Sequence, residues 1–225
     1  HLDKAKKGTG KFTELYLMEG FMDVIAAYRA GIENAVASMG TALSKEHVDH
    51  LKRFTKKIVL SYDGDKAGQA ATAKALEELK GFSVEVVRVP DAMDPDEYLQ
   101  KNSPEDLAYL LTKTRISPIE FYIHQLKPEN SDNLQAQIEF IEKIAPLIAK
   151  EKSITAQNSY IHILADNLPS FDYQQVEQIV NESRIVQRQE RVKEEQPPAA
   201  ISLPVTRQLT AVMRAEAHLL YSCLL

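Results

Sequence analysis

A short apolar run ends in an acidic turn in the stretch Lys57-Ile58-Val59-Leu60-Ser61-Tyr62-Asp63-Gly64-Asp65-Lys66-Ala67-Gly68. The run is rich in β-branched residues, and an alanine-rich helical pattern follows it from Gln69 to Leu79. This order predicts a buried strand, a tight turn and a helix. In an open α/β sheet, ligands bind at the carboxyl ends of the strands, so the acidic turn is a candidate site.

Asp63 and Asp65 are two positions apart, and such residues point to the same side of an extended segment. Two carboxylates about 4 Å apart repel by about 4 kcal/mol at an effective dielectric constant of about 20. Mg²⁺ would relieve that repulsion, because a hard cation takes oxygen ligands. The alternative is structural, since Asp-Gly is a common turn signal and Asp65 can cap the following helix. The turn by itself leaves both interpretations open.

A second acidic turn follows the apolar run 15–18, where Glu19 precedes a predicted helix over 21–28. Glu19 ends its strand as Asp63 ends its own. Asp23 lies in the first turn of that helix, where a carboxylate interacts favourably with the helix dipole. For Asp23 taken alone, this electrostatic role is the better interpretation.

A third acidic turn follows the run 83–89, which is the clearest strand in the chain by its β-branched residues. It carries Asp94 and Asp96. Asp94 is also a good helix cap, with Pro95 at the first helical position and Glu97 three residues after the cap. From the residues alone, the structural and the functional interpretations are equally good.

The three turns become more informative when they are taken together. The carboxyl ends of adjacent parallel strands meet at one edge of a sheet, so the acids of all three turns are predicted to converge. Such a cluster is costly without cations. Two-metal phosphoryl chemistry is therefore the leading mechanistic hypothesis.

Composition excludes several classes of protein. The net charge of −5 gives no global signature of nucleic-acid binding, although a local basic path would be compatible with it. Cys223 is the one cysteine, so no internal disulfide and no cysteine-based zinc site can form. His47 and His50 have no partner ligands in the sequence and are interpreted as surface residues. No apolar run approaches the ~20 residues that span a membrane, and no signal peptide opens the chain, so we expect a cytoplasmic protein without a membrane partner.

The second half of the chain changes in character. From Pro104 to about Arg191, amphipathic helical patterns predict an all-α region without strands. Apolar stripes recur over 134–148 and 154–168, and Asp172 can cap a third helix. A charged run over 187–198 ends in Pro-Pro, which is typical of a helix that gives way to a linker.

Four segments resemble the Toprim segment of bacterial DNA primases: Glu19–Asp23, Ala35–Thr41, Tyr62–Gly68 and Asp94–Asp96. The resemblance extends over roughly residues 12 to 100. It implies an α/β fold with a mainly parallel sheet flanked by helices, followed by a helical subdomain. It also implies RNA primer synthesis with Mg²⁺, for which Mn²⁺ could substitute.

The resemblance further implies which residues carry the chemistry. Glu19, Asp63 and Asp65 would be catalytic metal ligands, and Asp23, Asp94 and Asp96 would belong to the same cluster. The family's glutamate is also assigned a role as general acid or base, and the sequence does not separate this role from ligation.

The same resemblance implies a domain organisation. Its parts would be a lead-in from a preceding subdomain (1–11), a Toprim domain (12–101), a helical subdomain (102–191), a linker (192–205) and the start of a helicase-interaction domain (206–225). The zinc module and the basic subdomain of the family are absent from this chain, so we expect it to have little or no primer synthesis by itself. The implied partners are a single-stranded DNA template, ribonucleoside triphosphates, an RNA–DNA hybrid and, through 206–225, the replicative helicase.

Two other classes of function are compatible with parts of the pattern. A Toprim topoisomerase or nuclease is one, but a topoisomerase needs a nucleophilic tyrosine and none of the nine tyrosines is marked as such. A non-catalytic piece that docks a helicase is the other. A fused helicase is not indicated, because no G-x-x-x-x-G-K-[ST] loop occurs.

Overall fold

The structure is a computed structural model that describes residues 13–40 and 43–195, with side chains up to residue 189. Its packing separates two units, of which the first ends at Ser183 and the second begins at Arg184, inside the last helix. The second unit is described only by the helical turns up to residue 195.

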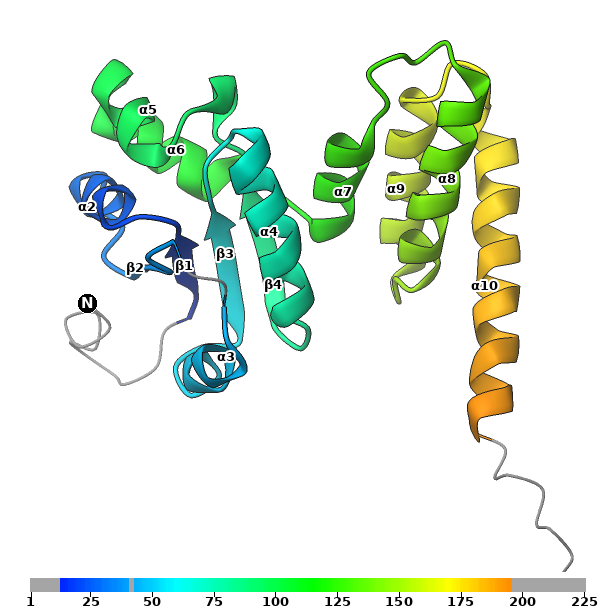
Figure 1. The fold of residues 1–225 in the computed structure, drawn as a ribbon, viewed down its shortest axis with the longest axis horizontal. Helices are drawn as coiled ribbons and strands as arrows, with labels where there is room; N and C mark the ends of the chain where they lie inside the picture. The colour runs from blue at the N-terminus through cyan, green and yellow to red at the C-terminus, as the bar shows by residue number, and fades with distance from the viewer. Residues whose placement is uncertain (1–12, 41–42, 196–225) are drawn as a thin grey trace, which may run out of the picture. The chain divides into compact units, whose positions relative to one another are not determined.

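The first unit is built on a sheet of five strands in the order β2-β1-β3-β4-β5 (Figure 1). Strands β1 to β4 all run parallel to one another, and β5 is antiparallel to its neighbour β4. The central strands are apolar runs buried on both faces, as parallel strands covered by helices must be. The strands are β1 (Leu15–Met18), β2 (Ala35–Ala37), β3 (Lys57–Ser61), β4 (Ser83–Val87) and β5 (Arg115–Ile116).

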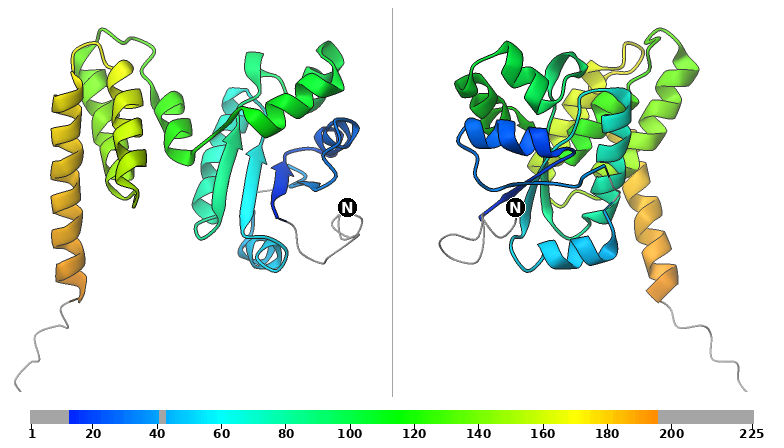
Figure 2. Two further views of the ribbon diagram at one scale, coloured as in Figure 1. Left: turned by 180° about the vertical axis from the view of Figure 1, so that it is seen from behind. Right: turned by 60° about the vertical axis from the view of Figure 1, so that its left-hand side comes forward.

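Helices cover both faces of this sheet (Figures 1 and 2). Successive residues of β1 alternate between two cores, with Tyr16 and Met18 in one and Leu15 and Leu17 in the other. The first core is closed by α2 (Phe21–Arg29), α5 (Pro95–Lys101) and α6 (Pro104–Lys113). The second core is closed by α3 (Lys45–Leu51), α4 (Lys66–Glu78) and α7 (Pro118–Leu126). The strands and helices predicted for this part are confirmed.

A third core lies among helices alone. It is formed by the end of α7 together with α8 (Leu134–Ala149), α9 (Ile154–Asp166) and the start of α10 (Tyr173–Glu195). Ile141, Ile144 and Ile148 lie on one stripe of α8 and are inaccessible to solvent, or nearly so. Asp172 accepts a hydrogen bond from the backbone N–H of Gln175 (2.8 Å), which confirms its predicted capping role. The predicted helical region is therefore present.

One expectation for this region is wrong. We expected no strand after Pro104, but Arg115–Ile116 forms β5 beside Val86–Val87. A two-residue strand has no periodicity that a sequence pattern can reveal. The helix before it, α6, packs into the first core through Leu107 and Leu111. The boundary at 101/102 stays a prediction, although the segment just beyond it packs with the sheet.

The C-terminal expectations are largely outside the described residues. Residues 192–195 are still helical, so α10 continues past the predicted start of the linker. The helicase-interaction segment 206–225 and the lead-in 1–11 are not described. Among the described residues, no helix is long and apolar enough to cross a membrane.

Candidate active site

The three acidic turns lie at one edge of the sheet, because the strands that precede them are parallel and in register. Met18 pairs with Ser61, and Leu60 pairs with Val86, so β1, β3 and β4 end at similar heights. Glu19 directly follows β1, and Asp63 lies two residues beyond β3. The third turn, over 89–94, leads from β4 into α5.

Asp63 lies in a negative environment at this edge. Burial raises the pKa of its carboxyl to about 7, and the negative charges of Glu19 and Asp23 act in the same direction. Asp94 and Asp65 contribute further repulsion. Burial and these four carboxylates are the strongest influences on the pKa, and no ion pair in the described part of the chain involves any of the five acids, so the turn carries an excess of negative charge. A bound cation would remove that excess.

Asp23 is the most buried of the predicted site acids, with 4% of its surface exposed. Its carboxylate accepts a hydrogen bond from the backbone N–H of Gly20 (2.9 Å), and a backbone hydrogen bond from Asp96 acts on it as well. Burial nevertheless raises its pKa to about 6. Asp23 therefore links the first acidic turn to the start of α5. First-turn electrostatics alone would not have indicated this link.

Asp65 and Asp94 are helix caps in the structure. Asp65 accepts a hydrogen bond from the N–H of Gly68 (2.7 Å), and Asp94 accepts one from the N–H of Glu97 (2.6 Å). The structural interpretation of both residues is confirmed. A cap uses one carboxylate oxygen, so it does not exclude a metal role for the other oxygen.

The first turn of α4 approaches the backbone of Asp63 closely. A Cβ added at Gly68 would lie 2.2 Å from the Asp63 carbonyl oxygen, a distance that no side chain can adopt. Gly68 thus allows the helix N-terminus and the acidic turn to pack together. The sequence pattern contains this glycine, but only the packing shows why it is needed.

The donors at this edge suit a hard divalent cation. Glu19 Oε2 and Ser61 Oγ are buried atoms without a hydrogen-bond partner among the described residues. Such an oxygen normally has a partner, and a cation would provide one for the carboxylate. As the side chains lie, however, no three His, Cys, Asp or Glu side chains in the described part of the chain form a set that could hold a metal ion. The donor chemistry fits a metal, and the identity of the ligands stays a prediction.

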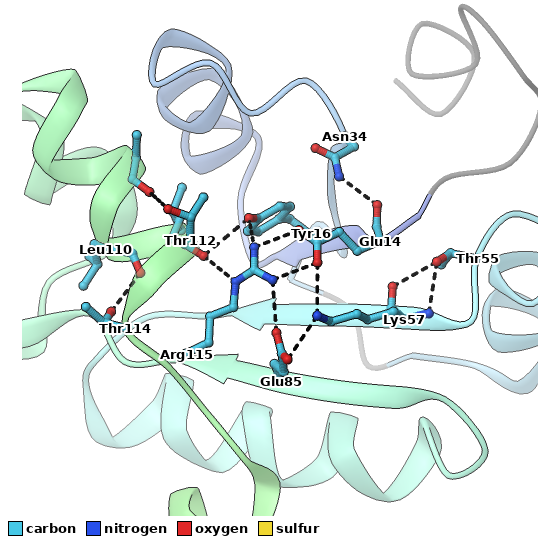
Figure 3. Close-up of polar contacts among 12 residues, drawn as sticks. Glu14, Tyr16, Asn34, Thr55, Lys57, Glu85, Leu110, Thr112, Thr114 and Arg115 are labelled. Atoms are coloured by element: carbon cyan, nitrogen blue, oxygen red, sulfur yellow. Dashed lines mark hydrogen bonds and ion pairs between the residues drawn. The ribbon is translucent and has the colours of Figure 1, made fainter.

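A second group of charges lies on the same sheet, with Glu14 just before β1, Lys57 at the start of β3 and Glu85 in the middle of β4 (Figure 3). Arg115 donates two hydrogen bonds of 2.8 Å to Glu14 and one of 3.0 Å to Glu85. Lys57 lies between the same two carboxylates, at 3.3 and 3.0 Å. The hydrogen bond from Arg115 is the main reason that the pKa of Glu14 is lowered. Burial acts to raise the pKa of Glu85, but Lys57 and Arg115 outweigh it and lower that pKa.

This cluster was not predicted from the sequence, because its members are far apart in the chain. Arg115 is 101 positions from Glu14 and 30 positions from Glu85. One available signal was Glu85 itself, a charged residue in the middle of an otherwise apolar strand. A charge at such a position predicts a partner across the sheet.

The described part of the chain has a groove and a small cavity near the sheet. A groove of about 740 Å³ runs between α2 and α3 and is lined mainly by apolar side chains, with His47 and His50 among them. None of the predicted site acids lines it. A smaller cavity of about 30 Å³ is lined by Asp63, Gly64 and Gln69 among others.

Comparison with known proteins adds independent information. Residues 16–99 match the family model described as Toprim-like. A DNA primase from Lactococcus lactis subsp. lactis (strain IL1403) is 56% identical over 181 residues, which cover 80% of this chain and 28% of the relative. The chain spans about a quarter to two-fifths of the length of the curated relatives it matches.

Solved structures agree with the sequence relatives. The RNA polymerase domain of Mycobacterium tuberculosis primase DnaG, in complex with a double-stranded DNA oligomer with a 6-nucleotide overhang, matches with a TM-score of 0.57 and 30% identity. The match covers 75% of this chain and 55% of that one. A DnaG primase catalytic domain bound to single-stranded DNA matches with a TM-score of 0.56 and 28% identity, over 76% and 56% of the two chains.

Proposed function

Because this chain carries a Toprim domain of the bacterial DNA primase type, we propose that it supplies the Mg²⁺-dependent centre for RNA primer synthesis on a DNA template. The observation that carries the proposal is the uncompensated negative charge around Asp63, at the carboxyl edge of a parallel sheet. Use of a divalent metal follows from the Toprim primase family. The choice of Mg²⁺, with Mn²⁺ as a substitute, rests on the all-oxygen donor set.

We assign metal ligation to Glu19, Asp63 and Asp65. Glu19 has a buried oxygen without a partner, and Asp63 has a pKa raised by burial and by its acidic neighbours. Asp94 and Asp96 are proposed as further members of the cluster. Ligation by Asp23 stays a prediction, because its carboxylate already interacts with backbone groups of Gly20 and Asp96.

The reaction would join the 3′ hydroxyl of a growing primer to the α-phosphate of a ribonucleoside triphosphate, with release of pyrophosphate. A bound divalent ion would supply neutralisation of the triphosphate and a lowered pKa for the attacking hydroxyl. The residues of this chain contribute by holding three carboxylate turns at one level of the sheet. Asp63 must be deprotonated for this role, and with a pKa of about 7 it is close to its titration midpoint at neutral pH.

We also propose which partners the protein binds. Both DnaG structures compared above contain DNA, and we propose that a single-stranded template passes the acidic edge together with ribonucleoside triphosphates and the nascent RNA–DNA hybrid. Docking of the replicative helicase on 206–225 lies outside the described residues. A cytoplasmic location stays a prediction. Topoisomerase or nuclease activity is not favoured, because the curated relatives compared are named DNA primase.

Calorimetric titration with Mn²⁺ tests the proposal directly. The comparison is between the chain and an Asp63→Asn/Asp65→Asn variant, with circular dichroism as a check of folding. Asparagine is as good a helix cap as aspartate, so the substitution at position 65 keeps the cap of α4. A matched control is Asp132→Asn/Asp166→Asn, which removes two exposed aspartates of the helical region.

We expect saturable binding by the chain and by the control, and loss of binding in the Asp63→Asn/Asp65→Asn variant. Equal binding by all three proteins would mean that Asp63 and Asp65 serve only as turn and cap. In that case the catalytic assignment would fail. A template-dependent assay with ribonucleoside triphosphates would add a second readout, for which we expect little or no product from this chain alone.

A further inference from the structure

The peptide groups around Gly64 join the second and third acidic turns. The N–H of Gly64 donates to the carbonyl of Met93 (2.9 Å), which directly precedes Asp94. The carbonyl of Gly64 accepts from the side-chain Nε2 of Gln69 (3.0 Å) on α4. Gly64 is thus held from both sides, and one of its contacts fixes the turn that carries Asp63 and Asp65 against the turn that carries Asp94.

The space around Gly64 is too small for a side chain. A Cβ there would lie 2.5 Å from the carbonyl oxygen of Val89 and 3.2 Å from Ala92 Cα. These contacts are backbone atoms, which cannot move aside as a flexible side chain would. Gly64 does not have a positive φ, so the requirement for glycine is one of space.

The segment opposite Gly64 is itself held in an unusual conformation. Asp91 and Ala92 both have positive φ, 56° and 55°, although neither is glycine. Left-handed conformations cost about 1–2 kcal/mol per residue outside glycine. This geometry bends the chain between Val89 and Met93, both nearly buried, toward Gly64.

We propose that Gly64 and Gln69 are positioning residues that fix the spacing between the Asp63–Asp65 turn and the Asp94–Asp96 turn, and thereby set the affinity for the metal. The inference rests on the proposed function, because spacing matters only if the acids share a ligand. Neither residue contributes a carboxylate, so neither is a metal ligand in the proposal. Their hydrogen bonds to the backbone would act indirectly, because contacts made by groups that do not bind the metal themselves orient the ligands in metal sites.

Gln69 also connects the contact between the two acidic turns to α7. Its backbone carbonyl accepts from the side chain of Gln125 on α7 (3.2 Å), while its own backbone N–H donates to Asp65 (2.9 Å). One glutamine of α4 therefore contacts Gly64, Asp65 and α7.

The test measures Mn²⁺ affinity in Gly64→Ala and Gln69→Met. Methionine keeps the length of glutamine but has no donor for the Gly64 carbonyl. Loss of contacts that orient metal ligands lowers affinity by about 10- to 100-fold, and we expect Gly64→Ala in that range. Loss of a single neutral hydrogen bond predicts about a fivefold effect for Gln69→Met.

Two controls separate positioning from general destabilisation. Gly81→Ala strains a residue with φ of 105° beyond the end of α4, where a Cβ meets no atom within 4 Å. It should lower the midpoint of thermal unfolding without changing Mn²⁺ affinity at a temperature where the fold is intact. Gln135→Met alters an exposed glutamine of α8 and should change neither quantity.

The outcomes also distinguish this inference from the proposed function. Absence of Mn²⁺ binding by the unaltered chain would remove the proposed function and this inference with it. Binding that is lost in Asp63→Asn/Asp65→Asn but unchanged in Gly64→Ala and Gln69→Met would keep the function and overturn the positioning role. Weakened binding in Gly81→Ala to the same degree as in Gly64→Ala would also overturn it.

Discussion

Two groups of carboxylates lie on one sheet, and their surroundings push their pKa values in opposite directions. In the first group, Glu14 before β1 and Glu85 in the middle of β4 share Arg115 and Lys57, and their pKa values are lowered. In the second group, at the carboxyl ends of the strands, burial and acidic neighbours raise the pKa of Asp63 to about 7. The first group holds the sheet together through its own partners. Among the described residues, the second group forms no ion pair with a basic side chain, and a bound cation would stabilise such a group.

The largest effect should come from removing the shared partner of the first group. Arg115→Met leaves two carboxylates without their guanidinium. Breaking a buried pair costs about 3–5 kcal/mol, and because Glu14 and Glu85 keep 23% and 34% exposure we expect about 2 kcal/mol. Urea denaturation measures the change. Arg53→Met, at an exposed position, is the control, and an equal effect of both variants would contradict the importance of the cluster.

The same change from acid to amide should have opposite signs in the two groups. Asp63→Asn removes an uncompensated charge, so in the presence of a chelator we expect it to stabilise the fold by about 1 kcal/mol, as substitutions at functional sites often do. Glu85→Gln removes a compensated charge and should destabilise it by about 1 kcal/mol. Urea denaturation of both variants with EDTA gives the signs. If both substitutions changed the free energy of unfolding in the same direction, the contrast between the two groups would be wrong.

The contrast also predicts how stability depends on pH. The folded pKa of Asp63 lies above its unfolded value of about 3.9, so its contribution is present at low pH and is lost as pH rises through about 7. The lowered pKa values of Glu14 and Glu85 act in the opposite sense, since their contribution is lost only as pH falls below about 4.

Between about pH 4 and about pH 7 the chelated protein should therefore lose stability, and Asp63→Asn should make this decline shallower. The measurement is the free energy of unfolding at several pH values. Saturating Mg²⁺ should reverse the decline, because binding requires the ionised acid. Identical pH profiles of the chain and the variant would contradict the raised pKa.

The smallest effect is expected at Tyr16. Its hydroxyl donates to the carbonyl of Leu111 (3.4 Å) and accepts from Arg115. Tyr16→Phe removes both contacts while the ring stays in the core, so we expect a loss of about 0.5 kcal/mol. Thermal unfolding measures it. In an Arg115→Met background the effect should shrink, since one of the two contacts is already absent.

The sequence patterns predicted which acidic residues lie at the site, but few of the hydrogen bonds that hold their turns together. The turns with Glu19, Asp63 and Asp94 follow strands that are plain from their apolar runs, and the caps at Asp65 and Asp94 were foreseen as alternatives. The interaction of Asp23 with the backbone of Asp96 was not predicted, because Asp96 lies on α5 and Asp23 on α2. The same holds for Gly64, whose partner Met93 follows a different strand.

What the sequence determined by itself is local: which runs are strands, where helices begin and where acids follow strands. Those features are encoded within a few residues, by side-chain size, branching and capping groups. Tertiary structure alone decided that Arg115 joins Glu14 and Glu85, that β5 completes the sheet, and that Gly64 and Asp23 tie the acidic turns together. These contacts depend on strand order and register, which bring distant residues together and leave no short-range pattern in the chain.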